Sequence, residues 1–337
     1  MASIVIQTSF LGDMVLTTPL IASLAERGPV DVVATPASAG LLANNPHVRT
    51  VIEYDKRRSA RGLRGFGRVV RQLRKSRAEA IYLAQGSLRS AALGFATGVP
   101  LRVGFRTSAG RALYSRTVPY RRELHHATRL WQLANPGDHP LPDEIRPRLY
   151  PDAVERAAVD ALLGNASDPR PLVTLAPGSV WATKRWPYYK DLARALADEA
   201  RVVVVGSKDD RTLAEEILAT AGAGAVDATG ILTLLASAEL IGRAALLVTN
   251  DSAPQHLASA MGTPTVAIFG PTVPEFGFGP LAPKSIVVGH PDLGCRPCDR
   301  HGPAVCPLQH WKCMRELGPD DVSARVRHLL STLISNP

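Results

Sequence analysis

The sequence contains no run of about 18 consecutive apolar residues, the length that a membrane-spanning helix requires, and we expect no such helix. The first residues, MASIVIQTSFLGD, lack the basic region that opens a secretory signal peptide and begin directly with a strand pattern. Neither a G-x-G-x-x-G fingerprint nor a P-loop occurs in the 337 residues, which argues against dehydrogenases and ATPases of those classes. These absences predict a globular protein of the cytoplasm.

Cysteine is scarce and confined to one segment near the end of the chain. Cys295, Cys298, Cys306 and Cys313 are the four cysteines, separated by two, seven and six residues. Four thiolates at this spacing could form a tetrahedral structural zinc site, whereas a reducing compartment disfavours disulfides. The residues themselves leave structural zinc, free buried thiols and disulfides open. Nothing in the pattern indicates a metal that takes part in chemistry, so we expect catalysis to require no cofactor.

Carboxylates are absent from residues 56–77, which hold ten lysines and arginines in a chain of net charge +9. Apolar residues at helical spacing and arginines on another stripe predict an amphipathic basic helix in this segment. A solvated charged face is the usual explanation, but no Asp or Glu is present for pairing at i,i+4, which favours an anionic partner. That partner could be nucleic acid, an anionic membrane surface or a phosphorylated glycolipid.

Two series of strands and helices follow one another along the chain. The first begins with a strand at Ser3–Gln7, and the second begins at Leu172 after a segment rich in loop residues. A linker at Gly164–Pro171 divides the chain into residues 1–165 and residues 166–337. The repeated order of strand, polar turn and helix predicts an α/β fold with two doubly wound, Rossmann-like domains.

Residues 250–272, NDSAPQHLASAMGTPTVAIFGPT, have the pattern of a strand end, a polar turn, a helix and a second strand. Asn250, Asp251 and Ser252 are residue types that cap helix N-termini. A helix N-terminus at the carboxyl end of a parallel strand suits an anion, because unpaired N–H groups and the helix dipole point at the ligand. The alternative is that Asp251 and Ser252 only cap the helix and that His256 is an ordinary packed histidine.

Three further positions place polar side chains at strand ends. Asp13, in the first loop, could project into a cleft, although a first-turn carboxylate that complements the helix dipole is the simpler interpretation. Lys184 and Arg185 lie in the segment PGSVWATKRWP, where they place cations beside a turn that suits an anion. Asp210, just past a strand at Arg201–Val205, is positioned to bind ribose hydroxyls, with a helix cap as the alternative.

Four segments resemble signatures of the lipopolysaccharide heptosyltransferases, the glycosyltransferases of family 9 that use ADP-heptose. Residues 250–272 are similar to N-D-[ST]-G-P-x-H-L-x-A-x-x-G-T-P-x-[VI]-x-[LI]-F-G-P-T, with Ala253 where glycine is usual. The first loop, SFLGD, is similar to S-x-L-G-D, residues 177–187 are similar to P-G-[SA]-x-W-x-x-K-x-W-P, and residues 102–106 are similar to an R-x-G-F segment. The resemblance implies the GT-B fold, in which two Rossmann-like domains face one another across a cleft.

The resemblance also implies roles for individual residues. Asp13 would be the general base that deprotonates the acceptor hydroxyl, and Lys184 would contact the donor phosphates and help to neutralise the leaving group. The N-terminal domain would bind the acceptor and the C-terminal domain the donor. The donor contacts, to which we add Asp210, would be Ser179, Lys184, Asp210, Asp251, Ser252, Ala253 and His256. The acceptor contacts would be Arg57, Arg58, Arg61, Arg64 and Arg106.

By that resemblance the chain is an inverting glycosyltransferase that moves heptose from ADP-L-glycero-β-D-manno-heptose to the phosphorylated inner core of lipopolysaccharide. Its partners would be this donor, this acceptor and the cytoplasmic face of the inner membrane, which it would contact peripherally, and not nucleic acid. Two alternatives remain. One is a sugar-nucleotide epimerase, or another transferase of nucleotide sugars, with the same fold. The other is a polyanion-binding protein without catalysis that uses residues 56–77.

Overall fold

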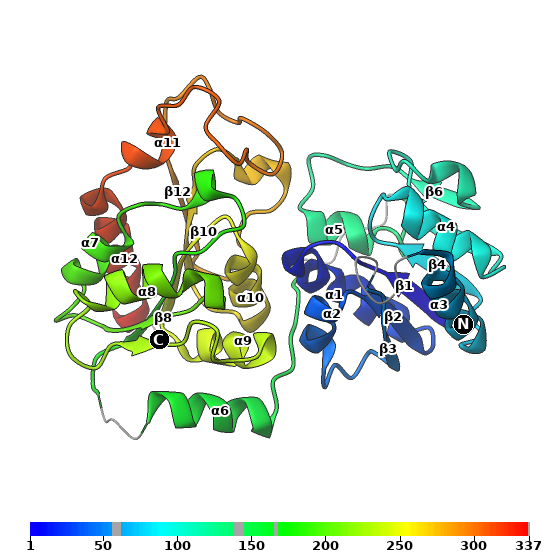
Figure 1. Ribbon diagram of the computed structural model, residues 1–337, viewed down its shortest axis with the longest axis horizontal. Coiled ribbons are helices and arrows are strands. Elements are labelled where there is room, and N and C mark those ends of the chain that lie inside the picture. The colour runs from blue at the N-terminus through cyan, green and yellow to red at the C-terminus, as the bar shows by residue number, and fades with distance from the viewer. Residues whose placement is uncertain (56–61, 138–144, 165–167, 336–337) are drawn as a thin grey trace. The chain divides into compact units, whose positions relative to one another are not determined.

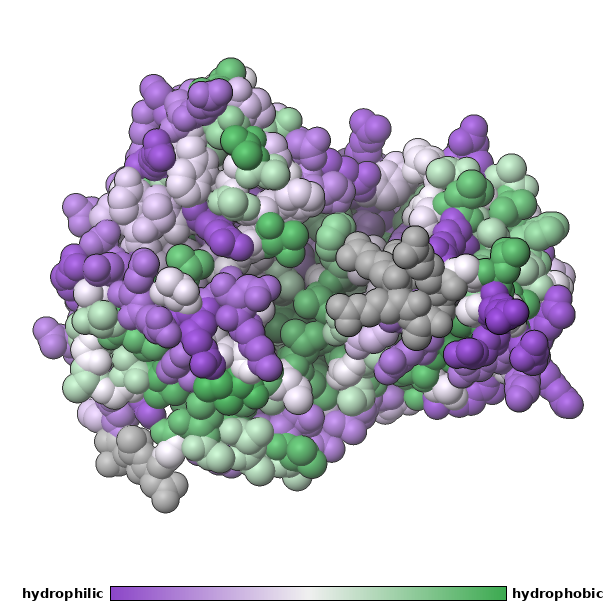
Figure 2. Space-filling view, in the orientation of Figure 1, coloured by the Kyte–Doolittle hydropathy of each residue, from purple (hydrophilic) through white to green (hydrophobic). Residues whose placement is uncertain are grey.

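The computed structural model describes residues 1–55, 62–137, 145–164 and 168–335. Contacts within the chain divide it into two compact units, Met1–Tyr150 and Pro151–Pro337 (Figure 1). None of the helices in the described ranges combines the length and the apolar character that a bilayer crossing requires. Hydrophilic side chains cover much of the face that is drawn in Figure 2.

The first unit forms, within its described residues, a six-stranded parallel sheet in the order β3-β2-β1-β4-β5-β6. The chain starts in the middle, builds outward to one edge, and then returns to build the other half, which is the doubly wound arrangement. The strands are β1 (Ser3–Ile6), β2 (Val30–Ala34), β3 (Thr50–Glu53), β4 (Ala80–Leu83), β5 (Leu101–Phe105) and β6 (Arg116–Val118). The helices are α1 (Leu11–Ala25), α2 (Pro36–Ala39), α3 (Gly62–Lys75), α4 (Leu88–Ala96) and α5 (His126–Trp131).

The second unit repeats this plan, and its described strands follow the order β12-β11-β10-β7-β8-β9 with parallel pairing throughout. The strands are β7 (Leu172–Ala176), β8 (Arg201–Val204), β9 (Val226–Asp227), β10 (Leu246–Asn250), β11 (Thr265–Phe269) and β12 (Ile286–Gly289). The helices are α6 (Ala153–Leu163), α7 (Tyr189–Ala195), α8 (Arg211–Leu218), α9 (Leu234–Arg243), α10 (Ala253–Met261), α11 (Lys312–Arg315) and α12 (Pro319–Ser335). The predicted fold class is confirmed, because both units are doubly wound α/β structures like the two halves of a GT-B fold.

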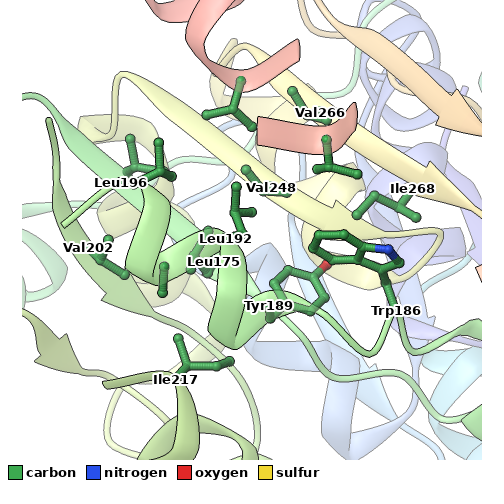
Figure 3. Close-up of a cluster of buried hydrophobic side chains, with 14 of the residues drawn as sticks. Leu175, Trp186, Tyr189, Leu192, Leu196, Val202, Ile217, Val248, Val266 and Ile268 are labelled. Carbon is green, nitrogen blue, oxygen red and sulfur yellow. The ribbon is translucent and has the colours of Figure 1, made fainter. Parts of the chain in front are cut away.

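Burial on both faces explains why the central strands are continuous apolar runs in the sequence. β1, β2, β4, β10 and β11 are buried along their whole length, as strands between two helical layers must be. In the second unit, Trp186 and Tyr189 pack edge to face over Val248 and Ile268 (Figure 3). Trp186 also donates from Nε1 to the carbonyl of Leu317 at 2.8 Å. This packing fixes the end of the loop that follows β7.

Helix α6 belongs to the second unit. It packs against α9, and Arg243 of α9 forms an ion pair with Asp160 of α6 at 2.5 Å. Val159 is the residue of α6 that is fully buried. The boundary between the compact units along the chain therefore falls between Tyr150 and Pro151, whereas the sequence placed it after residue 165.

Candidate functional site

Two loops leave neighbouring strands at the carboxyl edge of the second sheet. β7 and β10 pair with Ala176 opposite Thr249, so the loops that follow them start side by side. Asn250, which is fully buried, joins the two loops through its side-chain amide. Its Nδ2 donates to the carbonyl of Pro177 at 2.8 Å, and its Oδ1 accepts from the backbone N–H of Trp186 at 3.1 Å. A buried amide that is satisfied from both ends holds the loops at a fixed separation.

Lys184 and Asp251, one from each loop, form an ion pair. Lys184 ends a single 3-10 turn, Ala182–Lys184, and its Nζ lies 2.6 Å from Oδ2 of Asp251 and 3.4 Å from the Asp251 carbonyl. The same Oδ2 accepts from Oγ1 of Thr272, just after β11, at 2.7 Å. The lysine is only 8% exposed. An ammonium has three donors and the described contacts use two, so this pair holds a cation at the start of α10 with one donor left for a ligand.

The first turn of α10 is not capped by its N-cap side chain. Ser252 occupies the N-cap position with extended backbone, but its Oγ lies 3.3 Å from Oγ1 of Thr249 and makes no capping hydrogen bond. Ala253 begins the helix, and Pro254, which has no N–H, follows it. The helix ends at Met261, and Gly262 follows it in the left-handed conformation. The loop therefore combines first-turn N–H groups without a side-chain cap and the ammonium of Lys184, an arrangement that suits an anion.

His256 lies one turn into α10 and is 6% exposed. Its ring meets Phe278 edge to face, with 6.5 Å between the centroids. The neighbouring Gln255 is fully buried and donates from Nε2 to the carbonyl of Phe278 at 2.5 Å. The segment that contains Phe278 is thus held against α10, and the surroundings of His256 agree with the packed histidine that the sequence offered as the alternative.

Asp210 lies beneath the turn that follows β7. Its Oδ2 accepts from the backbone N–H and from Oγ of Ser207, each at 2.8 Å, as the alternative of a helix cap predicted. A methyl group at Gly178 would lie 2.5 Å from the carboxyl carbon of Asp210, and one at Gly206 would lie 3.0 Å from its Cβ. The side chain is 8% exposed. Asp210 therefore packs against the Pro177–Gly178 turn and supports it.

Ser179 and Arg185 shape the rest of this loop. Ser179 is half-buried, and its Oγ lies 3.4 Å from the backbone nitrogen of Trp181. Arg185 donates from Nε to the carbonyl of Ser179 at 2.9 Å, so this second cation folds back on its own loop. Of the two adjacent cations in the sequence, Lys184 faces α10 and Arg185 stabilises the loop.

In the first unit, Asp13 lies in the first turn of α1 and is joined to the loop before it. Its Oδ2 accepts from Oγ of Ser9 at 2.5 Å and lies 3.4 Å from the backbone nitrogen of Phe10. The same Ser9 hydroxyl lies 2.6 Å from Oε1 of Gln7, whose Nε2 donates to Oγ1 of Thr17 at 3.1 Å. The carboxylate thus complements the helix N-terminus, as the simpler interpretation predicted, while about a fifth of its side chain stays exposed.

His126 is a neighbour of Asp13 that the sequence did not indicate. It begins α5, which packs against α1, and its Nε2 lies 3.9 Å from Oδ1 of Asp13. His125 precedes it as the N-cap residue and accepts from the backbone N–H of Ala127 at 3.2 Å. The helix start was predictable from the sequence, but the meeting of residues 13 and 126 depends on how α5 packs on α1.

Of the five arginines implied as acceptor contacts, two lie among the described residues. Arg57, Arg58 and Arg61 lie outside the described residues. Arg64, in the first turn of α3, and Arg106, after β5, are both exposed. Their guanidinium groups face solvent and could meet an anionic ligand.

The four cysteines, Cys295, Cys298, Cys306 and Cys313, are free thiols, so the disulfide alternative is not realised. Cys295 Sγ lies 3.9 Å from Nε2 of His310. Nowhere in the described ranges do three or more His, Cys, Asp or Glu side chains come together in a way that could hold a metal ion. The structural zinc site that the spacing allowed stays a prediction.

The environments of three thiols differ. Burial raises the pKa of Cys313 to about 11, and burial together with the neighbouring thiols raises the pKa of Cys298. Burial also acts to raise the pKa of Cys306, but the N–H groups around its sulfur, led by that of Trp311 at 3.4 Å, outweigh this and lower it.

A comparison with protein families matches residues 66–311 to the model described as Glycosyltransferase family 9 (heptosyltransferase). The chain is 30% identical to Lipopolysaccharide heptosyltransferase 2 of Escherichia coli K12 over 310 residues, which cover 86% of this chain and 88% of that protein. It superposes on the structure of E. coli ADP-heptose lps heptosyltransferase II with a TM-score of 0.80 at 26% identity, covering 98% and 99% of the two chains. A glycosyl transferase family 9 structure from Veillonella parvula shares the fold with a TM-score of 0.84 at 21% identity, covering 98% and 97%.

Proposed function

This chain belongs to glycosyltransferase family 9, the heptosyltransferase family, and we propose that it transfers heptose from ADP-heptose to the inner core of lipopolysaccharide. The matched family makes it a glycosyltransferase. The names of its relatives, lipopolysaccharide heptosyltransferase 2 and ADP-heptose lps heptosyltransferase II, support the choice of donor and acceptor.

The observation that carries the proposal is the Lys184–Asp251 pair at the first turn of α10. A nucleoside diphosphate that departs from a sugar carbon gains negative charge, which must be met by fixed positive groups and N–H donors. Lys184 offers the cation, and the first-turn N–H groups of α10 offer the donors. We propose that these groups neutralise the departing diphosphate, as a divalent metal ion does in other enzymes, so that transfer requires no metal or other cofactor.

Asp13 is the proposed general base. Its carboxylate would take the proton of the acceptor hydroxyl while that oxygen bonds to the anomeric carbon, the bond to the diphosphate breaks and ADP leaves with inversion. The Ser9 hydroxyl supports this role, because it lies between Asp13 and Oε1 of Gln7 and has one proton to give. Once Asp13 is protonated, it can donate to Ser9, and Ser9 can donate to Gln7. Both protonation states of the base are therefore satisfied.

The remaining donor contacts are proposed from the loops described above. Ser179 and Ser252 lie on the same two loops as the ion pair, and Ala253 supplies the first helical N–H. His256 and Asp210 are buried, so we propose that they act by fixing α10 and the Pro177–Gly178 turn; Asp210 as a ribose contact remains a prediction.

The acceptor is proposed to meet the basic surface of the first unit. Arginine guanidinium groups recognise phosphate oxygens in a bidentate manner, and Arg64 and Arg106 are exposed. Arg57, Arg58 and Arg61 remain candidates from the sequence. Because lipopolysaccharide is anchored by lipid, we propose that the protein works from the cytoplasm in peripheral contact with the inner membrane, and that nucleic acid is not a partner.

The test is calorimetric titration with ADP, UDP and GDP. The proposal expects selective binding of ADP by the wild type, weaker binding by Lys184→Ala, and unchanged binding by the control Lys190→Ala, an exposed lysine on α7. Transfer to a heptose-deficient lipopolysaccharide would then be assayed with ADP-heptose. A preference for UDP would point to another nucleotide-sugar enzyme, and the absence of nucleotide binding would leave only a polyanion-binding protein.

A further inference from the structure

The cations of α3 lie on one line along the helix. Arg64, Arg68, Arg71 and Lys75 follow at intervals of four, three and four residues, which places them on one stripe. All four, here called the basic stripe, are exposed, whereas the opposite face, which includes Leu73, is buried. Within the described part of the chain, no ion pair or side-chain hydrogen bond joins the basic stripe to another residue.

The positive charge of the protein is concentrated in the unit that contains this helix. Residues 1–150 hold 22 Lys and Arg against 10 Asp and Glu, whereas residues 151–337 hold 17 against 20. Like charges at i,i+4 destabilise a helix, so the basic stripe is unfavourable for α3 itself. A partner that carries many negative charges would remove this repulsion.

Large apolar side chains are exposed near the two ends of α3. Leu63, at the start of α3, is 89% exposed, and Phe95, near the end of α4, is 55% exposed. The two helices are joined by Arg74, which donates from Nη2 to the carbonyl of Ala96 at 2.8 Å and from Nε to that of Thr97 at 3.3 Å. Phe95 therefore lies next to the C-terminal end of α3. Figure 2 shows hydrophilic and hydrophobic side chains together over the region where Figure 1 places α3.

We propose that α3, with Phe95 of α4, is the surface by which this protein lies on an anionic phospholipid bilayer. A basic helix with exposed Leu and Phe binds in the interface plane, with cations at the headgroup phosphates and apolar side chains at the acyl boundary. Charge alone would also suit nucleic acid, but the apolar surfaces of Leu63 and Phe95 would then stay exposed to water unless bases stacked on them. The choice of occupant rests on the proposed function, because a transferase whose acceptor is held by lipid must work at a membrane surface.

The test is flotation of the full-length protein with vesicles of phosphatidylcholine alone or mixed with phosphatidylglycerol. The wild type is expected to bind the mixed vesicles, and to bind them less as salt rises. Each arginine near an anionic surface is worth about fivefold in partitioning, so Arg68→Gln/Arg71→Gln should lose about 25-fold. The control Lys190→Gln/Arg325→Gln removes the same charge from exposed positions of the second unit and should bind as the wild type does.

The apolar half of the proposal has its own variant. Leu63→Ser/Phe95→Ser keeps every charge and should still lose at least about fivefold in binding to mixed vesicles. Full retention by this variant, together with tight binding of single-stranded DNA by the wild type, would overturn the bilayer in favour of nucleic acid. Equal loss in the Lys190/Arg325 control would overturn the assignment to α3. ADP binding is measured in parallel and should not change in either α3 variant, so a failure of the donor-site proposal would be seen separately.

Discussion

Replacing Lys184 by methionine separates the structural role of its ion pair from its role toward a ligand. The change removes the ammonium but keeps most of the buried stem, and it leaves the Asp251 carboxylate, whose side chain is 12% exposed, with Thr272 as its described donor. Breaking one side of a buried ion pair costs about 3 kcal/mol, since the remaining charge loses its partner. For a unit of this size, that corresponds to a fall in melting temperature of about 6–12 °C.

The double variant Lys184→Met/Asp251→Asn removes the stranded charge as well. Its melting temperature should return to within about 3 °C of the wild type, because a buried pair that is replaced as a pair is close to neutral. ADP affinity should not return, because a charge-assisted hydrogen bond to phosphate is worth about 1.5–3 kcal/mol, or roughly 10- to 100-fold in Kd. Thermal melts and calorimetric titration of the wild type, both single variants and the double variant give the complete cycle.

Two results would refute this reasoning. A double variant that binds ADP as tightly as the wild type would show that Lys184 is only a structural partner of Asp251. A double variant as unstable as Lys184→Met would show that the loop depends on the lysine stem or on Asp251 in another way, and not on the balance of the two charges.

Three further predictions concern Asp13, Gly178 and Asp168. Asp13→Ala should lower the transfer rate by about 10²- to 10⁴-fold and leave ADP binding intact, and equal loss of both would contradict its assignment as base. Gly178→Ala puts a methyl group 2.5 Å from the Asp210 carboxylate and should lower the free energy of unfolding in urea by about 1–3 kcal/mol, whereas Gly67→Ala, inside α3 with nothing within 4 Å, should raise it by about 0.5–1 kcal/mol. Hydrogen bonds from the side chain and backbone of Arg170 lower the pKa of Asp168 to about 2. The stability that these hydrogen bonds add is fully present above the pKa of Asp168 in the unfolded chain, about 4, and is lost as the pH falls from there through 2. The difference in melting temperature between the wild type and Asp168→Asn should therefore close between about pH 4 and pH 2.

Much of the fold was predictable because each unit has a sheet buried on both faces. The strands predicted at Ser3–Gln7 and Arg201–Val205 are β1 and β8, each one residue shorter, and the second series begins at Leu172 as predicted. The domain boundary was predicted less well, since Gly and Pro after α6 suggested a linker there. The unit to which a surface helix belongs depends on the helix that it packs against, which for α6 is α9. The sequence of α6 alone does not identify that partner.

The candidate site was predictable as a set of loops but not as a set of contacts. Parallel strands collect their carboxyl ends at one edge, so polar residues after β7 and β10 had to lie near each other. The partners of those residues depend on tertiary packing: Thr272 reaches Asp251 from the end of β11, and His126 reaches Asp13 from a helix far along the chain. Thr272 is the last residue of the signature over residues 250–272, but that pattern does not say that it meets Asp251, and His126 belongs to none of the quoted patterns.

Asp251 shows how a contact changes the interpretation of a motif residue. The sequence offered it as a helix cap or as a contact of the donor phosphates, but its Oδ2 accepts from Lys184 and Thr272. A carboxylate would repel a diphosphate if it faced the ligand directly, because both are negatively charged. Its effect on a bound diphosphate must therefore pass through Lys184, whose ammonium it holds beside the first turn of α10. Removing Asp251 should thus weaken ADP binding by freeing the lysine, and Asp251→Asn, which can still accept from Lys184, should weaken it less than Asp251→Ala.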